Sequence, residues 1–150
     1  MNQVSQKDLE WRSYTSPKGG FEAAGMDYAG ALRDPDSRQP FEMILLRIPP
    51  GQRPWPYHSH GAQWEHYFVM EGSGEMRLED GPVAITKGDA MMCPPGEAHQ
   101  LINTGEEDLV VQIVADNPPA DYCNYPDSGK WALSGKVFRM EETVYYDGEE

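Results

Sequence analysis

The middle of the chain alternates short apolar runs with groups of glycine, proline and acidic residues. Residues 41–48 (FEMILLRI) are apolar on both parities, which predicts a strand that is buried on two faces. Residues 64–70 (WEHYFVM) and 109–115 (LVVQIVA) are rich in aromatic and β-branched side chains and predict two more strands. These three runs form the framework of the predicted fold.

Shorter elements lie between these strands. Residues 75–85 contain Asp80-Gly81 between two apolar stretches, a pattern that is typical of a β-hairpin. The sequences AMMC at 90–93 and HQLIN at 99–103 predict two further strands, and the turn sequence PPGE separates them. Because no helical pattern alternates with these strands, a parallel βαβ fold is disfavoured and an all-β sandwich or barrel is expected.

The two ends of the chain are less regular than the middle. Residues 1–40 mix polar, small and turn-forming residues, and we expect them to add an edge strand or to cross to a partner subunit. Residues 117–150 follow the last strong strand and end in an acidic, solvated tail. A length of 150 residues predicts one domain, 1–150, with its core at 41–116 and an extension on either side.

The charge of the chain narrows the choice of partners. A formal net charge of −13 argues against a nucleic-acid partner, because phosphate binding needs a basic face, and against an anionic membrane surface. No run approaches the roughly 20 apolar residues of a membrane span, and the first ten residues lack the apolar segment of a signal peptide. We therefore expect a cytoplasmic protein in which Cys93 and Cys123 are free buried thiols.

The histidines are concentrated in one place. The chain has four, and three of them lie between residues 58 and 66. His58 and His60 share one face of a strand, as residues i and i+2 do, and such a pair can grip a transition metal. Glu65 follows His60 at an odd offset, and Gly61 permits a bend that restores its facing. His66 should then point to the outer surface.

The fourth histidine, His99, follows the stiff turn Pro94-Pro95-Gly96 and begins a strand. In a closed barrel this strand can lie beside the strand of the paired histidines. Three imidazoles and one carboxylate would then converge, from His58, His60, Glu65 and His99. We expect this set to hold one divalent transition metal ion per chain and to leave coordination positions open. Its ligand types suit Fe, Mn, Ni, Co and Zn alike.

Two stretches of this sequence resemble the two motifs of the cupin superfamily. The first motif is matched by Gly51, His58-x-His60, Glu65 and Gly72, with one residue more than the family spacing between Gly51 and His58. The second is matched by Gly88, Pro94-x-Gly96, His99 and Asn103. The resemblance covers residues 41–116. It implies a jelly-roll barrel, the cupin double-stranded β-helix, with the metal bound inside.

The resemblance also implies an assembly and a subgroup. Cupins commonly dimerise, which implies a homodimer. The segment YPDSGKW at 125–131 is similar to a tail that follows the barrel in small single-domain cupins, some of which are named as sugar-phosphate-isomerase-like. We expect this segment to close one end of the barrel or to cross to a partner subunit.

A metal held by three histidines and one glutamate can bind a small acid, enediol or diol through two oxygens and act as a Lewis acid. The leading expectation is a metal-dependent oxygenase or decarboxylase of a small acid. The alternatives are a sugar or sugar-phosphate isomerase or epimerase, and a non-catalytic cupin that binds a small ligand.

Three further residues are candidates for work on a substrate. Tyr67 shares the parity of Glu65 and should face the barrel interior, where it could donate a proton or simply pack in the core. Arg47 and Arg53 flank the first motif, and either could pair with a substrate carboxylate or phosphate.

Overall fold

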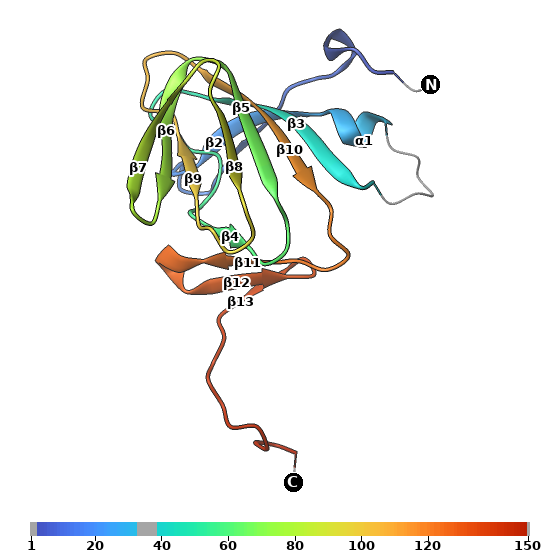
Figure 1. Ribbon diagram of the computed structural model, residues 1–150, viewed down its shortest axis with the longest axis vertical. Coiled ribbons are helices and arrows are strands. Elements are labelled where there is room, and N and C mark those ends of the chain that lie inside the picture. The colour runs from blue at the N-terminus through green and yellow to red at the C-terminus, as the bar shows by residue number, and fades with distance from the viewer. Residues whose placement is uncertain (1–2, 33–38, 150) are drawn as a thin grey trace.

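The computed structural model describes residues 3–32 and 39–149, and antiparallel strands are the main regular elements of that part. The larger sheet has six strands in the order β1-β2-β3-β10-β5-β8. Their bounds are Arg12–Thr15 (β1), Glu22–Asp27 (β2), Phe41–Ile48 (β3), Glu65–Glu71 (β5), Ala90–Cys93 (β8) and Leu109–Asp116 (β10). Figure 1 shows this sheet curving round one side of the molecule.

A second sheet faces the first and completes the barrel. It has the order β7-β6-β9, and a bridge between His58 and His99 joins it to the short strand β4. The bounds are Ser59–His60 (β4), Ser73–Leu78 (β6), Gly81–Thr86 (β7) and Gln100–Ile102 (β9). The predicted all-β jelly-roll barrel is therefore confirmed.

Several strands lie where the hydrophobic pattern predicts them. β3 and β8 have the predicted bounds, and β5 and β10 differ from theirs by a residue or so. The hairpin β6–β7 turns at Glu79–Asp80, one residue earlier than predicted, because Gly81 already pairs with Leu78 at the start of β7. Gly81 has φ +120, a conformation that glycine adopts without strain.

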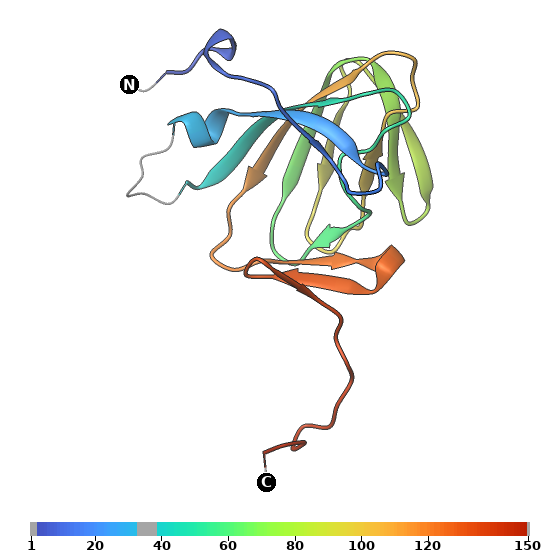
Figure 2. The same cartoon turned by 180° about the vertical axis from the view of Figure 1, so that it is seen from behind.

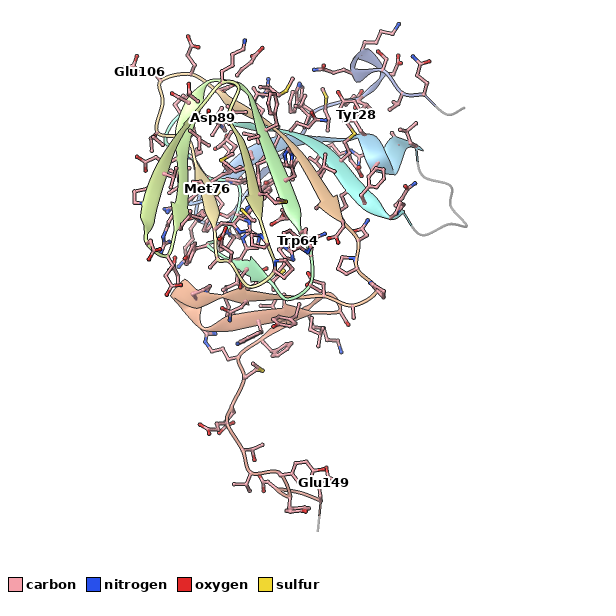
Figure 3. The ribbon with its side chains drawn as sticks, viewed as in Figure 1. Tyr28, Trp64, Met76, Asp89, Glu106 and Glu149 are labelled. Carbon is pink, nitrogen blue, oxygen red and sulfur yellow. The ribbon has the colours of Figure 1, made fainter. Side chains whose placement is uncertain are left out.

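The inward side chains of both sheets form one apolar core. Leucine, isoleucine and valine side chains from β3, β9 and β10 interlock with Tyr67, Val69 and Met76. The buried core residues are Ala23, Leu46, Ile48, Tyr67, Val69, Met76, Ile85, Cys93, Leu101, Leu109, Val111 and Ile113. Figure 3 shows side chains filling the space between the sheets. The core supports one end of the barrel and leaves the other end for the polar cluster described below.

The N-terminal residues widen the larger sheet. β1 and β2 form a hairpin, and β2 pairs with β3, so the expected edge strand is present and is doubled. A short 3₁₀ helix (Gln6–Asp8) precedes this hairpin, and a short helix, α1 (Tyr28–Leu32), follows it. No helix among the described residues is long and apolar enough to cross a membrane.

The C-terminal residues form a small sheet across the lower end of the barrel (Figures 1 and 2). It consists of β11 (Tyr122–Tyr125), β12 (Lys130–Leu133) and β13 (Lys136–Phe138), and β11 pairs with β4. The segment YPDSGKW forms the turn between β11 and β12, with a 3₁₀ helix at Pro126–Ser128. Of the two predicted roles for this segment, the structure shows closure of the barrel end. Residues beyond β13 extend away from the barrel (Figure 2).

Candidate metal centre

Two chain segments present histidines to each other at the lower end of the barrel. The backbone N–H of His58 donates to the carbonyl of His99 (3.1 Å), and the N–H of His99 donates to the carbonyl of His58 (2.8 Å). Gly96, with φ +86, donates its N–H to the carbonyl of His60 (2.8 Å). The Pro-Pro-Gly turn is therefore fixed to β4, and this contact sets the position from which His99 enters the site.

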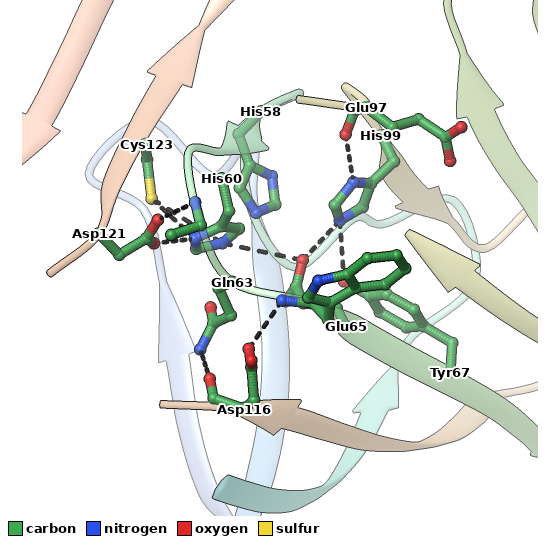
Figure 4. Close-up of polar contacts among 12 residues, drawn as sticks. His58, His60, Gln63, Glu65, Tyr67, Glu97, His99, Asp116, Asp121 and Cys123 are labelled. Carbon is green, nitrogen blue, oxygen red and sulfur yellow. Dashed lines mark hydrogen bonds and ion pairs between the residues drawn. The ribbon is translucent and has the colours of Figure 1, made fainter. Parts of the chain in front are cut away.

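Glu65 is the common point of the cluster (Figure 4). Ligand atoms of His58, Glu65 and His99 all lie within 4.8 Å of one another. Oε2 of Glu65 lies 2.8 Å from Nε2 of His99 and 3.7 Å from Nε2 of His60. The rings of His58 and His60 approach to 5.1 Å between centroids. The structure thus brings the four predicted ligands to one end of the barrel, with His60 at the side of the other three.

The three imidazoles are oriented in the same way, because an oxygen lies beside Nδ1 of each. Nδ1 of His58 faces the Pro56 carbonyl at 3.0 Å, and Nδ1 of His99 faces the Glu97 carbonyl at 3.1 Å. Nδ1 of His60 faces Oδ2 of Asp121 at 2.5 Å. These oxygens only accept hydrogen bonds, so each Nδ1 carries the hydrogen. In the neutral rings Nε2 therefore keeps its lone pair, which is the arrangement that metal-binding histidines have.

The surroundings of Oε2 of Glu65 show whether a cation fits among the imidazoles and this carboxylate. Glu65 is 8% exposed, and its Oε2 lies 2.8 Å from Nε2 of His99. A carboxylate oxygen and an imidazole lone pair repel each other unless a proton or a cation lies between them. A divalent transition metal, bound by imidazole and carboxylate, meets this requirement. The residues present therefore fit a metal ion, whose identity the donor set leaves open.

The pKa values of the ion-free cluster show how strongly it attracts positive charge. Burial lowers the pKa of His99, but contacts with Cys93 and Glu65 outweigh burial and raise it to about 10. Burial also lowers the pKa of His60, while Cys123, Asp121 and Glu65 raise it to about 9. Burial raises the pKa of Glu65, yet the imidazoles, His99 first, bring it below its ordinary value. Without a metal, protons take the place of the cation.

His58 differs from the other two histidines. Burial is the main reason that its pKa falls to about 4, and the neighbouring charge on His99 lowers it further. The Tyr125 ring of β11 stacks near the His58 ring, with centroids 6.2 Å apart and an interplanar angle of 25°. His58 is therefore neutral at ordinary pH and needs no proton loss before it can bind a metal.

A second group of possible ligand atoms surrounds His60. Atoms of His60, Asp121 and Cys123 also lie within 4.8 Å of one another. However, Sγ of Cys123 is 3.5 Å from Nδ1 and 3.8 Å from Nε2 of His60. An atom at nearly equal distances from both nitrogens lies beside the ring and along neither lone pair. Cys123 therefore packs against His60 rather than sharing a cation with it.

Of the three other predicted site residues, only Tyr67 lies at the cluster. Tyr67 is fully buried, and its hydroxyl lies 3.0 Å from Nε2 of His99. Arg47 lies over the Trp11 ring and 3.8 Å from Asp108, and Arg53 lies over the Phe21 ring. Neither arginine joins the cluster, because position 47 has the outward parity of β3 and Arg53 turns toward the N-terminal hairpin.

His66 and Gly61 are the other residues of the first motif for which the sequence predicts a position or a role. His66 lies on the exposed outer face, as predicted. Gly61 has no positive φ; a Cβ there would lie 2.2 Å from the Tyr122 ring. The chain bends at Gly61 and Ala62, as predicted, and Glu65 faces the histidines; the close approach of the Tyr122 ring is a second reason for this glycine.

Sequence reasoning missed two acidic residues of the site. Asp121 accepts hydrogen bonds from the His60 ring and from the N–H of Ala62 (2.8 Å). Glu42 pairs with Ala115, which also pairs with Glu65, so the two glutamates lie on one face with a single strand between them. Their Cα atoms are then about 10 Å apart. Burial first, and then Asp27 and Glu65, raise the pKa of Glu42.

The barrel and the cluster at its end define the class of protein. Residues 44–115 match the family model of the cupin domain. The barrel of this chain is therefore a cupin barrel.

Individual relatives extend this result. The chain is 30% identical over 115 residues to auxin-binding protein 1 of Arabidopsis thaliana (71% of this chain, 56% of that protein). It is 33% identical over 64 residues to an oxalate-binding protein of Thermotoga maritima (43% and 52%). The chain thus spans about half the length of these curated relatives. Among solved structures, it resembles a cupin-superfamily sugar phosphate isomerase of Silicibacter pomeroyi, with TM-score 0.79, 21% identity, and coverage of 97% and 98%.

Proposed function

We propose that this protein is a metal-dependent isomerase or epimerase of a small hydroxy-carbonyl compound of the sugar class. The observation that carries the proposal is the convergence of three imidazoles, each with Nδ1 beside an oxygen, around the buried carboxylate of Glu65. A divalent metal held by His58, His60, Glu65 and His99 would supply a Lewis acid for the carbonyl and hydroxyl oxygens of a substrate.

Isomerisation also requires a group that moves a proton between neighbouring carbon atoms. Glu42 is placed for this work, because it lies on the inner face of β3, is exposed, and shares its face with Glu65. Its raised pKa, caused first by burial, keeps its acid and base forms closer in energy than those of an ordinary carboxyl group. In the proposed reaction Glu42 takes a proton from one carbon and returns it to the next.

One comparison supports this proposal. The resemblance to the isomerase of Silicibacter pomeroyi covers nearly the whole of both chains. It therefore includes the C-terminal sheet whose residues contact His58 and His60.

The charge of the site favours a substrate without phosphate. Among the described residues, no lysine or arginine forms a hydrogen bond or ion pair with any of the four ligand side chains. The nearby lysine, Lys130, has its ammonium over the Tyr125 ring. Arg77 is already held by a bidentate ion pair with Asp127 (2.7 and 2.8 Å). Because no lysine or arginine of the described residues contacts the ligand side chains, we propose that the substrate is an unphosphorylated sugar.

A second candidate is the binding or decarboxylation of a small dicarboxylic acid. The match to the oxalate-binding protein of Thermotoga maritima supports it, because that match is 33% identical over 64 residues. Two carboxylates on the inner face, Glu42 and Glu65, would repel a dianion and so place this candidate second.

One experiment separates the two candidates. The metal-loaded protein is incubated in D₂O with aldoses, ketoses and their phosphates, and separately with oxalate, and NMR follows interconversion and deuterium uptake at carbon. We expect metal-dependent interconversion of an unphosphorylated sugar, and its loss in Glu65→Gln. Turnover of oxalate with no effect on any sugar would replace the proposal with the second candidate.

A further inference from the structure

A cavity of about 750 Å³ lies outside the barrel, where the outer face of the smaller sheet meets β4 and β11 (Figure 1). Its volume is in the range of small-molecule sites. In β6 the outward residues Glu75 and Arg77 alternate with the buried residues Gly74 and Met76, so the cavity is separate from the core and the metal cluster. We call it the outer groove, and the polar residues that line it are Tyr57, Ser59, Glu75, Arg77, Glu79 and Asn124.

Two nearly buried side chains present hydroxyl groups to the outer groove. Ser59 is 8% exposed and Tyr57 is 7% exposed, and both line the cavity. Ser59 lies between His58 and His60 along the chain, so its side chain points away from the metal cluster and into the groove. Within the described part of the chain, neither hydroxyl takes part in a hydrogen bond. Asn124, the cross-strand partner of Ser59, adds an amide on the same face. Side chains this buried normally have partners, so these groups indicate a ligand.

The charges of the outer groove select the sign of that ligand. Arg77 donates two hydrogen bonds to the carboxylate of Asp127 (2.7 and 2.8 Å), and its guanidinium lies over the Tyr57 ring, 4.1 Å from the centroid. Its positive charge is therefore already balanced. Glu75 and Glu79 form no ion pair with a lysine or arginine of the described residues. Two carboxylates thus remain without a counter-charge, and the groove attracts a cation.

We propose that the outer groove is a second binding site, and that it takes a small organic ammonium ion that also carries hydroxyl groups, such as an amino sugar or an amino alcohol. The ammonium group donates hydrogen bonds to the carboxylates of Glu75 and Glu79, which accept only. The hydroxyl groups of the ligand pair with Ser59, Tyr57 and Asn124, whose side chains both donate and accept. A neutral sugar lacks the ion pairs, and an anion meets two like charges. This site depends neither on the metal nor on the proposed reaction.

The test is a titration of the ¹⁵N-labelled full chain with glucosamine at low ionic strength, followed by the chemical shifts of the backbone amides. Glucose and gluconate are the neutral and anionic counterparts, and each titration is made on metal-free and on Zn²⁺-loaded protein. We expect saturable shifts at the outer groove with glucosamine, with equal Kd in the two metal forms. Glucose and gluconate should bind at least roughly tenfold more weakly, because each lacks the ammonium group. Added salt should weaken the binding of glucosamine.

Variants locate the binding. The double variant Glu75→Gln, Glu79→Gln should weaken glucosamine binding by roughly tenfold, and Ser59→Ala by roughly threefold or more. Glu106→Gln is the matched control, because it removes an exposed carboxylate at the opposite end of the barrel (Figure 3) and should leave Kd unchanged. Equal binding of glucose, shifts that spread over the surface without saturation, or an equal loss in Glu106→Gln overturns the inference. Binding that occurs only in the Zn²⁺-loaded form also overturns it, because glucosamine then binds at the metal. All of these outcomes leave the metal site and the proposed reaction standing.

Discussion

Replacement of Asp121 by asparagine tests how His60 is held. Each oxygen of the carboxylate accepts one hydrogen bond, Oδ2 from the His60 ring and Oδ1 from the N–H of Ala62. An asparagine has one acceptor oxygen and one NH₂ donor, so Asp121→Asn can keep only one of these bonds. Either the ring or the backbone N–H then faces another donor. We expect His60 to lose the tautomer and orientation that point Nε2 at Glu65.

The structure sets the size of this effect. The Asp121 side chain is 21% exposed and that of His60 13%, so the hydrogen bond is only partly screened by solvent. A hydrogen bond to a charged group contributes about 1.5–3 kcal/mol. Loss of a partner that orients a metal-bound histidine typically lowers metal affinity by roughly 10–100-fold, equal to about 1.4–2.7 kcal/mol. We expect Asp121→Asn to lie in this interval.

The assay is a competition between the protein and a coloured chelator for Zn²⁺ or Co²⁺. Asp116→Asn is the control, because Oδ1 of Asp116 accepts the N–H of Trp64 (2.8 Å), two residues after Ala62, and forms no hydrogen bond with an imidazole of the described residues. We expect it to change affinity by less than a few-fold. Equal affinity for the wild type and Asp121→Asn would refute the reasoning, and so would an equal loss in both variants.

The remaining predictions concern the ligands, the acid–base group, the ion pair between Arg77 and Asp127, and the assembly. His60→Ala should sharply lower metal content by elemental analysis, whereas His66→Ala, on the outer face, should leave it unchanged. Glu42→Gln should bind metal normally but lose roughly 100-fold or more in the rate of sugar interconversion. Arg77→Ala removes the ion pair that ties β6 to Asp127 in the turn between β11 and β12. This change should speed the removal of metal by a chelator by less than roughly fivefold, because the ion pair is exposed. The homodimer stays a prediction; if the exposed apolar side chains of β5 and β8 form its interface, Met92→Lys should give a monomer in sedimentation velocity.

The strands and the convergence of the four candidate ligands could be predicted because their signals are local. β3 and β8 follow from apolar runs between turn residues, and the spacing of His58 and His60 follows from the two-residue repeat of a strand. The Pro-Pro-Gly turn and His99 lie within six residues of one another. Each of these features is contained in a few consecutive residues.

Contacts between distant segments could not be predicted in the same way. Asp121 is 61 residues from His60, and no spacing rule connects an irregular C-terminal segment with the first motif. Arg47 and Arg53 were predicted to bind a substrate because they flank that motif. Strand parity turns Arg47 outward, and each arginine packs over an aromatic ring away from the cluster. Glu42 was accessible to sequence reasoning, because it is a charged residue on the parity of Leu46 and Ile48, which are core positions.

The position of Glu42 also bears on the choice between the two candidate functions. β11 and the residue before it, Asp121, cover the cluster from one side. Tyr125 lies against His58 and Cys123 against His60, and Asp121 accepts hydrogen bonds from His60 and Ala62. Glu42 lies on the other side, exposed at the end of β3, so a ligand that reaches Glu65 from that side passes a carboxylate. A neutral sugar meets a hydrogen-bond acceptor there, whereas oxalate meets a like charge. Glu42→Gln should therefore weaken the turnover of a sugar and strengthen the binding of oxalate, two opposite effects that one variant measures together.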